Sequence, residues 1–300
     1  MTDIINQIKQ SFKNGDILTR LIFVNVGVYL FIVAVRIIFG LFTSIEVGEI
    51  DGFSVKYLGV PTNNLTELIF KFHTLITHLF LHITFNHILS NMILLYFLGK
   101  IFLSYFTPKK LLGLYFLGGF IGIGLLEIIS IISPKFQEAN YAYGASAAVM
   151  AIVVGVCAHA PKSEVRLFGI LPIKLMWLGA GIVLLDFVNM MDENTGGHIA
   201  HIGGAITGYY FAKSHSQGKD ITKGINTIIS KIVSIFKPGR RMKVVHSQEN
   251  VRNMSDEEYN KSKKANQEEI DKILDKISAS GYASLSKQEK ENLFKFSNRK

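Results

Sequence analysis

The chain has 300 residues, of which 49% are hydrophobic, and a formal net charge of +9. Residues 1–212 hold 13 Lys and Arg against 12 Asp and Glu, whereas residues 213–300 hold 19 against 11. This asymmetry argues against a single globular protein and favours a membrane-embedded body with a soluble appendage. Retention of basic residues on the cytoplasmic side of a membrane explains the basic tail, so we expect no nucleic-acid partner.

Six stretches of the chain are apolar enough to predict membrane-spanning helices, because a span needs about 20 apolar residues to cross about 30 Å of hydrocarbon. They cover residues 21–42, 84–106, 111–133, 144–160, 171–190 and 198–213. Arg36 interrupts the first stretch, but its long side chain can reach an interface. The predicted fold is therefore an all-α membrane protein with a bundle of six transmembrane helices.

The distribution of basic residues predicts the orientation, since cytoplasmic loops are enriched in Lys and Arg. If the six spans cross the membrane in alternate directions, the basic residues before span one and those after spans two and four lie on one side of the membrane. The basic tail lies on the same side. The opposite side receives Glu46, Glu49 and Asp51 in the long 43–76 loop. We therefore expect a multi-pass protein of the cell inner (cytoplasmic) membrane, with the lipid bilayer as a partner and both termini in the cytoplasm.

Ser146 occupies an unusual depth in the predicted fourth span. It lies 16 residues before Lys162, where this span meets the cytoplasm. At 1.5 Å per residue, Ser146 is about 24 Å above that end and about 6 Å below the outer boundary of the hydrocarbon core. Non-helical backbone at this depth must be buried in protein or face a water-filled cavity. A serine at such a helix start has a plausible catalytic setting.

Small residues predict that the fourth and sixth spans approach closely, because such residues let membrane helices bring their backbones together. They recur at four-residue spacing as Ala147, Ala151 and Gly155 in one span and Ala200, Gly204 and Gly208 in the other. This packing would bring His201 near Ser146, where an imidazole could take the proton of the hydroxyl. No carboxylate neighbours His201 in the sequence, so the residues predict a Ser–His dyad without an aspartate.

His87 and Asn91 lie four residues apart in the second span and so share one helix face. Their N–H groups, with the backbone N–H of Ser146 that is free at a helix start, are suitable donors for an anionic tetrahedral intermediate. His82 lies five residues before His87.

Three motifs together resemble the rhomboid family of intramembrane serine proteases. They are Gly144-Ala145-Ser146, His87-Ile88-Leu89-Ser90-Asn91, and Ala200-His201-Ile202-Gly203-Gly204-Ala205-Ile206-Thr207-Gly208. The resemblance implies a rhomboid-like bundle with Ser146 as nucleophile, His201 as base, and His87, Asn91 and the Ser146 amide as the oxyanion hole. It implies a structural or water-holding role for His82, and single-span membrane proteins as substrates. No cofactor is implied. The family's Trp-Arg pair in the first outer loop is absent.

Other readings remain open beside this one. An inactive rhomboid-like protein that binds membrane-protein clients would share the fold. A transporter would need paired intramembrane charges. Glu127 lies in a predicted span, and Asp186 is the only other carboxylate that the sequence places at a similar depth. His78 and His82, four residues apart, resemble half of a zinc site, but no His-Glu-x-x-His motif or nearby cysteine accompanies them, so we expect no metal.

The chain divides into four predicted parts. These are a cytoplasmic N-terminal segment (1–17), a membrane domain (18–213), a basic linker (214–253) and a small helical cytoplasmic appendage (254–300). Apolar residues at helical spacing within 221–236 indicate a helix that lies on an anionic membrane surface. Two capping boxes, starting at Ser255 and Ser286, predict helices in the appendage, with Gly281 as a stop. The sequence does not identify a partner for this tail.

Overall fold

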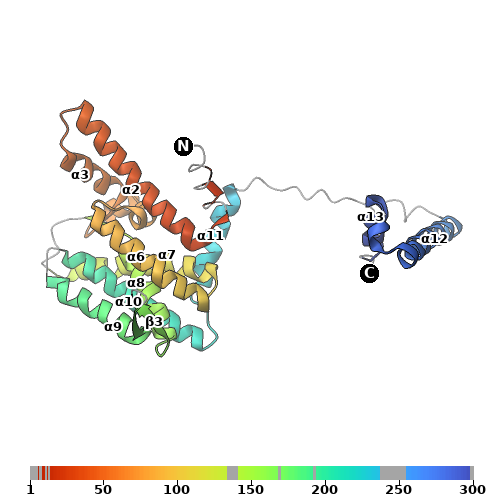
Figure 1. Cartoon of the computed structure of the whole chain (residues 1–300). Coiled ribbons are helices and arrows are strands. Elements are labelled where there is room, and N and C mark those ends of the chain that lie inside the picture. The colour runs from red at the N-terminus through yellow and green to blue at the C-terminus, as the bar shows by residue number, and fades with distance from the viewer. Residues whose placement is uncertain are drawn as a thin grey trace. The chain divides into compact units, whose positions relative to one another are not determined.

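A computed structural model of the chain describes residues 6, 9–10, 12, 14–133, 141–167, 170–191, 194–236 and 255–297. It contains two compact units, Met1–Lys237 and Pro238–Lys300. The first unit is a helical bundle and the second is a pair of helices (Figure 1). The 237–254 part of the predicted tail, and most of the N-terminal segment before residue 14, lie outside the described residues.

The first unit begins with a long apolar helix and a folded loop. The helix is α2 (Ile17–Phe42), which starts where the Asp16 side chain accepts a hydrogen bond from the Thr19 N–H at 2.8 Å. The loop then contains α3 (Val47–Leu58), β1 (Val60–Pro61), α4 (Leu65–Phe70), α5 (Thr74–Thr77) and the 3₁₀ turn η1 (His78–Phe80). β1 pairs with β2 (Tyr141–Ala142), which ties this loop to the segment just before Ser146.

The remaining helices build the bundle. They are α6 (Phe85–Tyr105), α7 (Pro108–Ile132), α8 (Ser146–His159), α9 (Leu175–Val188), α10 (Thr195–Ser216) and α11 (Lys223–Phe236), with the 3₁₀ turn η3 (Asn189–Met191) between α9 and α10. Threonine side chains cap α6 and α7, as Thr84 and Thr107 accept from backbone N–H groups of the first turn. These caps satisfy donors that a helix start leaves without partners.

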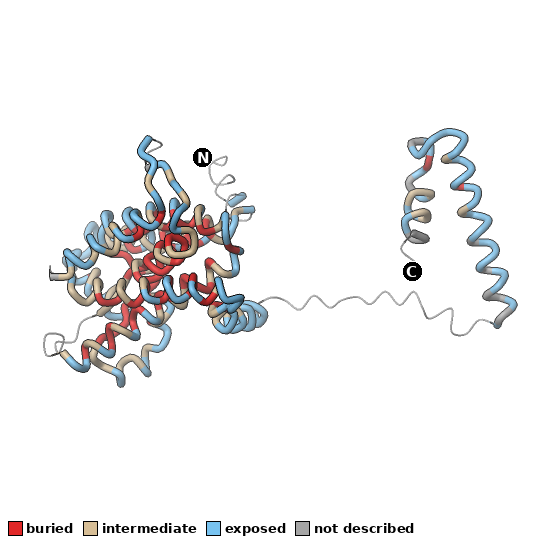
Figure 2. The backbone as a smooth tube through the Cα atoms, turned by 90° about the horizontal axis from the view of Figure 1, so that it is seen from below, coloured by how far each residue is buried: buried red, intermediate tan, exposed pale blue. Residues whose placement is uncertain are grey.

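Helix α8 is the centre of the first unit. Ten of its 14 residues are buried, because it packs against α6, α7, α9 and α10 at once. A helix that is apolar all round is stable only where neighbours surround it, and Figure 2 shows the buried backbone gathered in this interior. By contrast, α2 lies along the edge of the unit and leaves Phe31, Leu41 and Phe42 more than two-thirds exposed.

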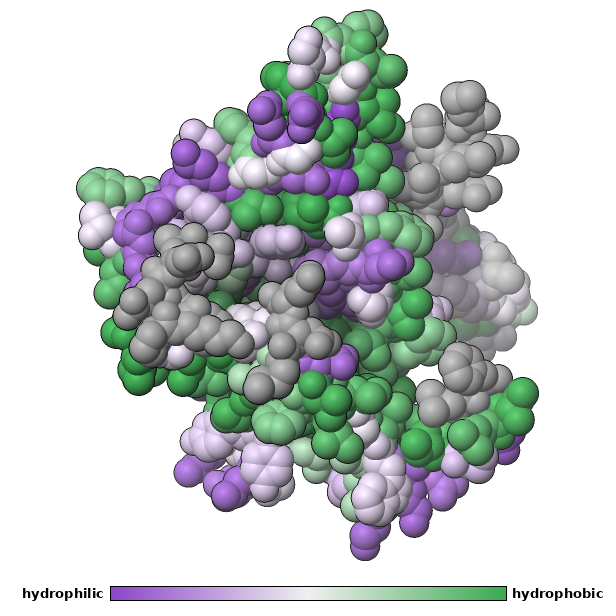
Figure 3. All heavy atoms as spheres, turned by 90° about the vertical axis from the view of Figure 1, so that its left-hand side faces the viewer, coloured by the Kyte–Doolittle hydropathy of each residue, from purple (hydrophilic) through white to green (hydrophobic). Residues whose placement is uncertain are grey.

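Among the residues that the structure describes, three helices, α2, α6 and α7, are long and apolar enough to cross a membrane by length and composition. Helices α8 and α9 are apolar but have only 14 residues each. Figure 3 shows one face of the molecule, on which apolar residues lie beside polar ones. Many large apolar side chains of these helices are exposed, as in a membrane protein.

The chain is mostly helical, as predicted, and it also contains short strands that the sequence did not predict. Strands β3 (Glu164–Leu167) and β4 (Leu171–Lys174) form an antiparallel hairpin, so α9 begins at Leu175 and not at residue 171. Pro172 explains part of the difference. Its ring is disfavoured inside a helix but is tolerated in an edge strand such as β4.

The second unit consists of α12 (Asp256–Ser280), the 3₁₀ turn η4 (Tyr282–Ser284) and α13 (Lys287–Ser297). Gly281, which follows the last residue of α12, has a φ of 77° and a ψ of 162°, a backbone conformation that favours glycine. At α13, the Ser286 N–H donates to Glu289 Oε2 at 2.6 Å while the Glu289 N–H donates to Ser286 Oγ. The second predicted capping box is therefore formed. Lys276 on α12 also binds Glu289, and these bonds lower the pKa of the Glu289 carboxyl to about 2.

Candidate active site

A tight turn delivers Ser146 to the first position of α8. Gly144 has a φ of 117°, which L side chains rarely adopt, and its N–H donates to the His78 carbonyl at 2.8 Å. A Cβ added at Gly144 would lie 2.6 Å from Cε1 of His87. Only glycine therefore fits between the turn and this imidazole.

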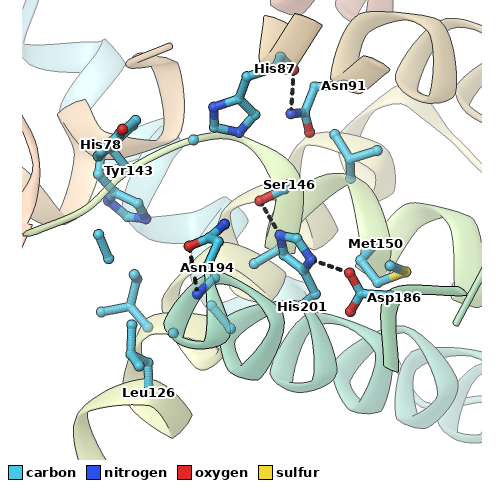
Figure 4. A pocket seen from close by; sticks show the side chains of 18 of the residues that line it. His78, His87, Asn91, Leu126, Tyr143, Ser146, Met150, Asp186, Asn194 and His201 are labelled. Atoms are coloured by element: carbon cyan, nitrogen blue, oxygen red, sulfur yellow. Dashed lines mark hydrogen bonds and ion pairs between the residues drawn. The ribbon is translucent and has the colours of Figure 1, made fainter. Parts of the chain in front are cut away.

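The small-residue stripes of α8 and α10 meet. A Cβ added at Gly204 would lie 2.1 Å from the Ala147 carbonyl oxygen, and one added at Gly208 would lie 2.3 Å from that of Ala151. The two helix backbones are thus in direct contact. This contact brings together two side chains that are 55 residues apart, since the Ser146 Oγ lies 2.5 Å from Nε2 of His201 (Figure 4). Both residues are partly exposed, so they can be reached from outside.

Asp186 on α9 extends the Ser146–His201 pair to a chain of three side chains. The expectation of a dyad without an aspartate is therefore wrong for the contacts of His201. The Nδ1–H of His201 donates to Asp186 Oδ1 at 2.6 Å. The same oxygen accepts from Nδ1 of His198 at 2.7 Å. Asp186 lies 15 residues before His201 on a different helix, so neither sequence proximity nor helical spacing links the two.

His87 and Asn91 both lie on α6 and line the same cavity as Ser146 and His201, which has a volume of about 1170 Å³. Figure 4 shows both on the Ser146 side of the cavity. The Asn91 side-chain amide donates one hydrogen bond, at 2.8 Å, to the His87 carbonyl of its own helix. A carboxamide has two N–H bonds, so the second stays available to an acceptor in the cavity.

His82 is fully buried just before α6 and supports the turn at Gly144. Its Nε2 accepts from the Ala145 N–H at 3.5 Å, and its ring centroid lies 4.9 Å from that of His87. His82 therefore touches both the turn that presents Ser146 and the imidazole that faces it.

The possible metal ligands that the structure brings together do not include the His78–His82 pair that the sequence suggested. The Nδ1–H of His78 donates to the Thr74 carbonyl at 2.8 Å, and His82 is occupied by the turn. Within the described part of the chain, only Asp186, His198 and His201 bring three ligand atoms within 4.8 Å of one another. Hydrogen bonds already account for each of these atoms.

Two polar clusters anchor the loop between α2 and α6. In the first, Arg36 of α2 donates to Asp51 of α3 at 2.5 Å and to the Ile83 carbonyl at 2.8 Å, so it joins the loop to the start of α6. In the second, Glu67 of α4 accepts from Lys71 at 2.7 Å and from the Tyr141 hydroxyl at 3.0 Å. The second cluster fastens α4 to β2, four residues before Ala145.

The Glu67–Lys71 pair gives a pH-dependent contribution to stability. The hydrogen bond from Lys71 lowers the pKa of Glu67 from 4.5, and the same bond raises the pKa of Lys71 from 10.5. The contribution of the pair to stability is therefore full between pH 4.5 and pH 10.5. It falls as pH drops through the lowered pKa of Glu67, and it falls as pH rises through the raised pKa of Lys71. We expect Glu67→Gln to lower the free energy of unfolding by less than about 1 kcal/mol at pH 7, as for a partly exposed pair.

Thermal unfolding in detergent at pH 7 and at pH 3 measures this effect. The difference between Glu67→Gln and the wild type should shrink towards pH 3, because the contribution of the pair falls as pH drops through the lowered pKa of Glu67. A difference of the same size at both pH values would show that the charge of Glu67 does not matter. Ser54→Ala on the neighbouring α3 is a control that removes a hydrogen bond but no charge.

Comparisons with known proteins agree with the geometry. The sequence profile of the Rhomboid domain matches residues 70–217. This range includes the three motifs at residues 87–91, 144–146 and 200–208. RHOMBOID-like protein 12, mitochondrial, of Arabidopsis thaliana is 30% identical over 148 residues, which cover 45% of this chain and 44% of that protein. The chain thus matches less than half the length of this relative. Residues 255–299 match a family of unknown function, DUF6576. On its motifs, its fold and the matched domain, the chain belongs to the rhomboid family.

Proposed function

We propose that the chain is an intramembrane serine endopeptidase that cleaves transmembrane segments of membrane proteins. The observation that carries this proposal is the distance of 2.5 Å between Ser146 Oγ and His201 Nε2 at the wall of a large cavity. In a neutral imidazole whose Nδ1 carries the proton, Nε2 offers a lone pair. His201 can therefore accept the hydroxyl proton while Ser146 Oγ bonds to the peptide carbonyl carbon.

The remaining steps follow from the same residues. The C–N bond of the substrate breaks as the imidazolium of His201 returns its proton to the leaving amine. A water molecule then attacks the ester on Ser146, with His201 again as base. The negative charge that develops on the carbonyl oxygen needs donors in position beforehand. The Ser146 backbone N–H, His87 and the second N–H of Asn91 are the donors in this proposal, and His82 and Gly144 support their arrangement.

The proposed topology has six membrane spans, namely α2, α6, α7, α8, α9 and α10, with both termini in the cytoplasm of the cell inner membrane. The 14 residues of α8 rise only about 21 Å. They are therefore too short for about 30 Å of hydrocarbon, which supports a helix that starts below the outer surface with Ser146 at its first position. The proposed domain limits are 1–17, 18–213, 214–253 and 254–300.

Cleavage of a single-span membrane protein by the purified full chain in liposomes tests the proposed function. The expected result is a cut within or next to the transmembrane segment, mapped by mass spectrometry of both products. The alternative is an inactive rhomboid-like protein that binds such clients. Substrate that is crosslinked to the wild-type chain but never cut would contradict the protease and favour this alternative.

We also propose that α11 lies on the anionic cytoplasmic leaflet. Its apolar face leaves Ile228, Ile232 and Ile235 at least 45% exposed, whereas lysines such as Lys223 and Lys231 occupy other positions around it. An exposed apolar stripe flanked by lysines binds membranes by burial and by charge.

Nitroxide labels on single cysteines test this placement, in a Cys157→Ser background that removes the chain's only native cysteine. In vesicles with anionic lipid, a label at Ile232→Cys should be relaxed by lipid-soluble oxygen. A label at Ser230→Cys, on the polar face, should be relaxed by a water-soluble nickel complex. Equal accessibility of both positions to the nickel complex would show that α11 is surrounded by water.

A further inference from the structure

The two hydrogen bonds to Asp186 are a feature that the proposed dyad does not use. One carboxylate oxygen, Oδ1, accepts from Nδ1 of both His201 and His198, at 2.6 and 2.7 Å. The three side chains retain only 12–15% of their accessible surface, so water competes little for these bonds. Figure 4 shows Asp186, His201 and Ser146 in a continuous line.

This arrangement determines which nitrogen of His201 carries the proton. A carboxylate only accepts hydrogen bonds, so the nitrogen that faces it must be the one that carries hydrogen. Since Nδ1 faces Asp186, the neutral ring has its lone pair on Nε2, which lies 2.5 Å from Ser146 Oγ. The opposite tautomer would present an N–H to the serine and could not act as its base.

The negative charge of Asp186 has a second consequence. When His201 takes the proton of Ser146 it becomes a cation, and a carboxylate in contact with its far nitrogen stabilises that cation. The other titratable groups that face His201 are His87 on α6 and His198 on α10. Neither of these carries a carboxylate, so Asp186 is the only carboxylate among the described residues in contact with the ring.

We propose that Asp186 is a positioning residue that orients His201 and fixes its tautomer, and that His198 holds Asp186 in place through a second hydrogen bond to the same oxygen. This role rests on the proposed protease function. It makes the site a Ser146–His201–Asp186 triad assembled from α8, α10 and α9, where the sequence alone predicted a dyad.

Steady-state cleavage of a single-span substrate by the full chain in liposomes tests this role, with Asp186→Asn, Asp186→Glu and His198→Gln beside the wild type. An asparagine keeps the shape of the side chain but loses its charge, and its amide can donate to Nδ1 and favour the wrong tautomer. We expect Asp186→Asn to lower kcat by about 10²-fold or more, with KM changed less than about threefold. Asp186→Glu should recover part of kcat, and His198→Gln should cost less than Asp186→Asn.

The split between kcat and KM separates this role from a structural one. A positioning role lowers kcat in Asp186→Asn and leaves KM and the unfolding temperature close to the wild-type values, whereas a disrupted site changes all three. Thermal unfolding of the same variants shows whether the fold is intact. Asp16→Asn is the matched control, because Asp16 caps α2 outside the cavity and asparagine caps equally well.

The outcomes are distinct. A kcat of Asp186→Asn within threefold of an active wild type would overturn the role of Asp186 and leave the proposed function intact. So would a fall in kcat that Asp186→Glu does not relieve and that accompanies a lower unfolding temperature. Activity of the wild type that disappears on treatment with a chelator would mean that Asp186 holds a metal ion instead. A wild type that cleaves nothing overturns the proposed function, and the role of Asp186 with it.

Discussion

Replacing Ser146 with alanine is expected to lower the cleavage rate of a single-span substrate by roughly 10⁴-fold or more, to the background of the assay. The physical reason is that Ser146 Oγ is the oxygen that His201 Nε2 contacts in the cavity. An alanine removes the attacking atom and leaves only the donors that stabilise charge. The measurement is the initial rate of product formation in liposomes by the wild-type and variant chains at equal concentration.

The matched control is Ser104→Ala. Ser104 is an exposed residue near the end of α6, where its hydroxyl donates to the Ile101 carbonyl of its own helix. This variant should cleave at the wild-type rate. His201→Ala should be as inactive as Ser146→Ala, and the double variant should be no worse, because residues that act as one unit are not additive. Cleavage that survives in Ser146→Ala would show that another residue is the nucleophile.

Replacing Gly204 with alanine is expected to have the second largest effect, although Gly204 takes no part in the chemistry. The added Cβ would lie 2.1 Å from the Ala147 carbonyl oxygen, which is backbone and cannot rotate away. The α8 and α10 backbones must therefore separate. Overpacking of this kind costs about 1–3 kcal/mol of stability. A displacement of about 1 Å between Ser146 and His201 would reduce the cleavage rate by about 10²-fold.

Thermal unfolding in detergent and cleavage in liposomes measure these two effects together. Gly124→Ala is the control, because Gly124 of α7 has no atom within 4 Å of an added Cβ. This substitution should leave cleavage unchanged and stabilise the helix by up to about 1 kcal/mol. If Gly204→Ala behaves like Gly124→Ala in both assays, the contact between α8 and α10 does not hold the two side chains together.

The sequence predicted the α8–α10 contact because membrane helices leave a local signal where they touch. Small residues at four-residue spacing mark the face of each helix, and Gly204 and Gly208 lie where the spacing placed them. The position of Ser146 near the start of α8 was similarly predictable, from its distance of 16 residues to Lys162 and from the thickness of the hydrocarbon core. In both cases the determining interactions are local or periodic.

The partner of His201 could not be predicted in this way. Asp186 lies 15 residues earlier on a helix of its own, and its contact with α10 depends on how α9 packs in three dimensions. The sequence offered Asp186 only as a possible second charge for a transporter. The same reason applies to Arg36, whose bonds to Asp51 and to the Ile83 carbonyl join residues up to 47 positions apart. The β3–β4 hairpin was missed because its apolar residues merge with those of α9.

The central claim is that His201 activates Ser146 as a nucleophile. Its most direct test is to treat the wild-type chain, in liposomes, with a phosphonate that reacts with activated serines, and to locate the adduct by mass spectrometry. We predict a single adduct on Ser146 that is absent in His201→Ala and retained in Ser104→Ala. An unmodified Ser146 in the wild type, or an equal yield of adduct without His201, would contradict the claim.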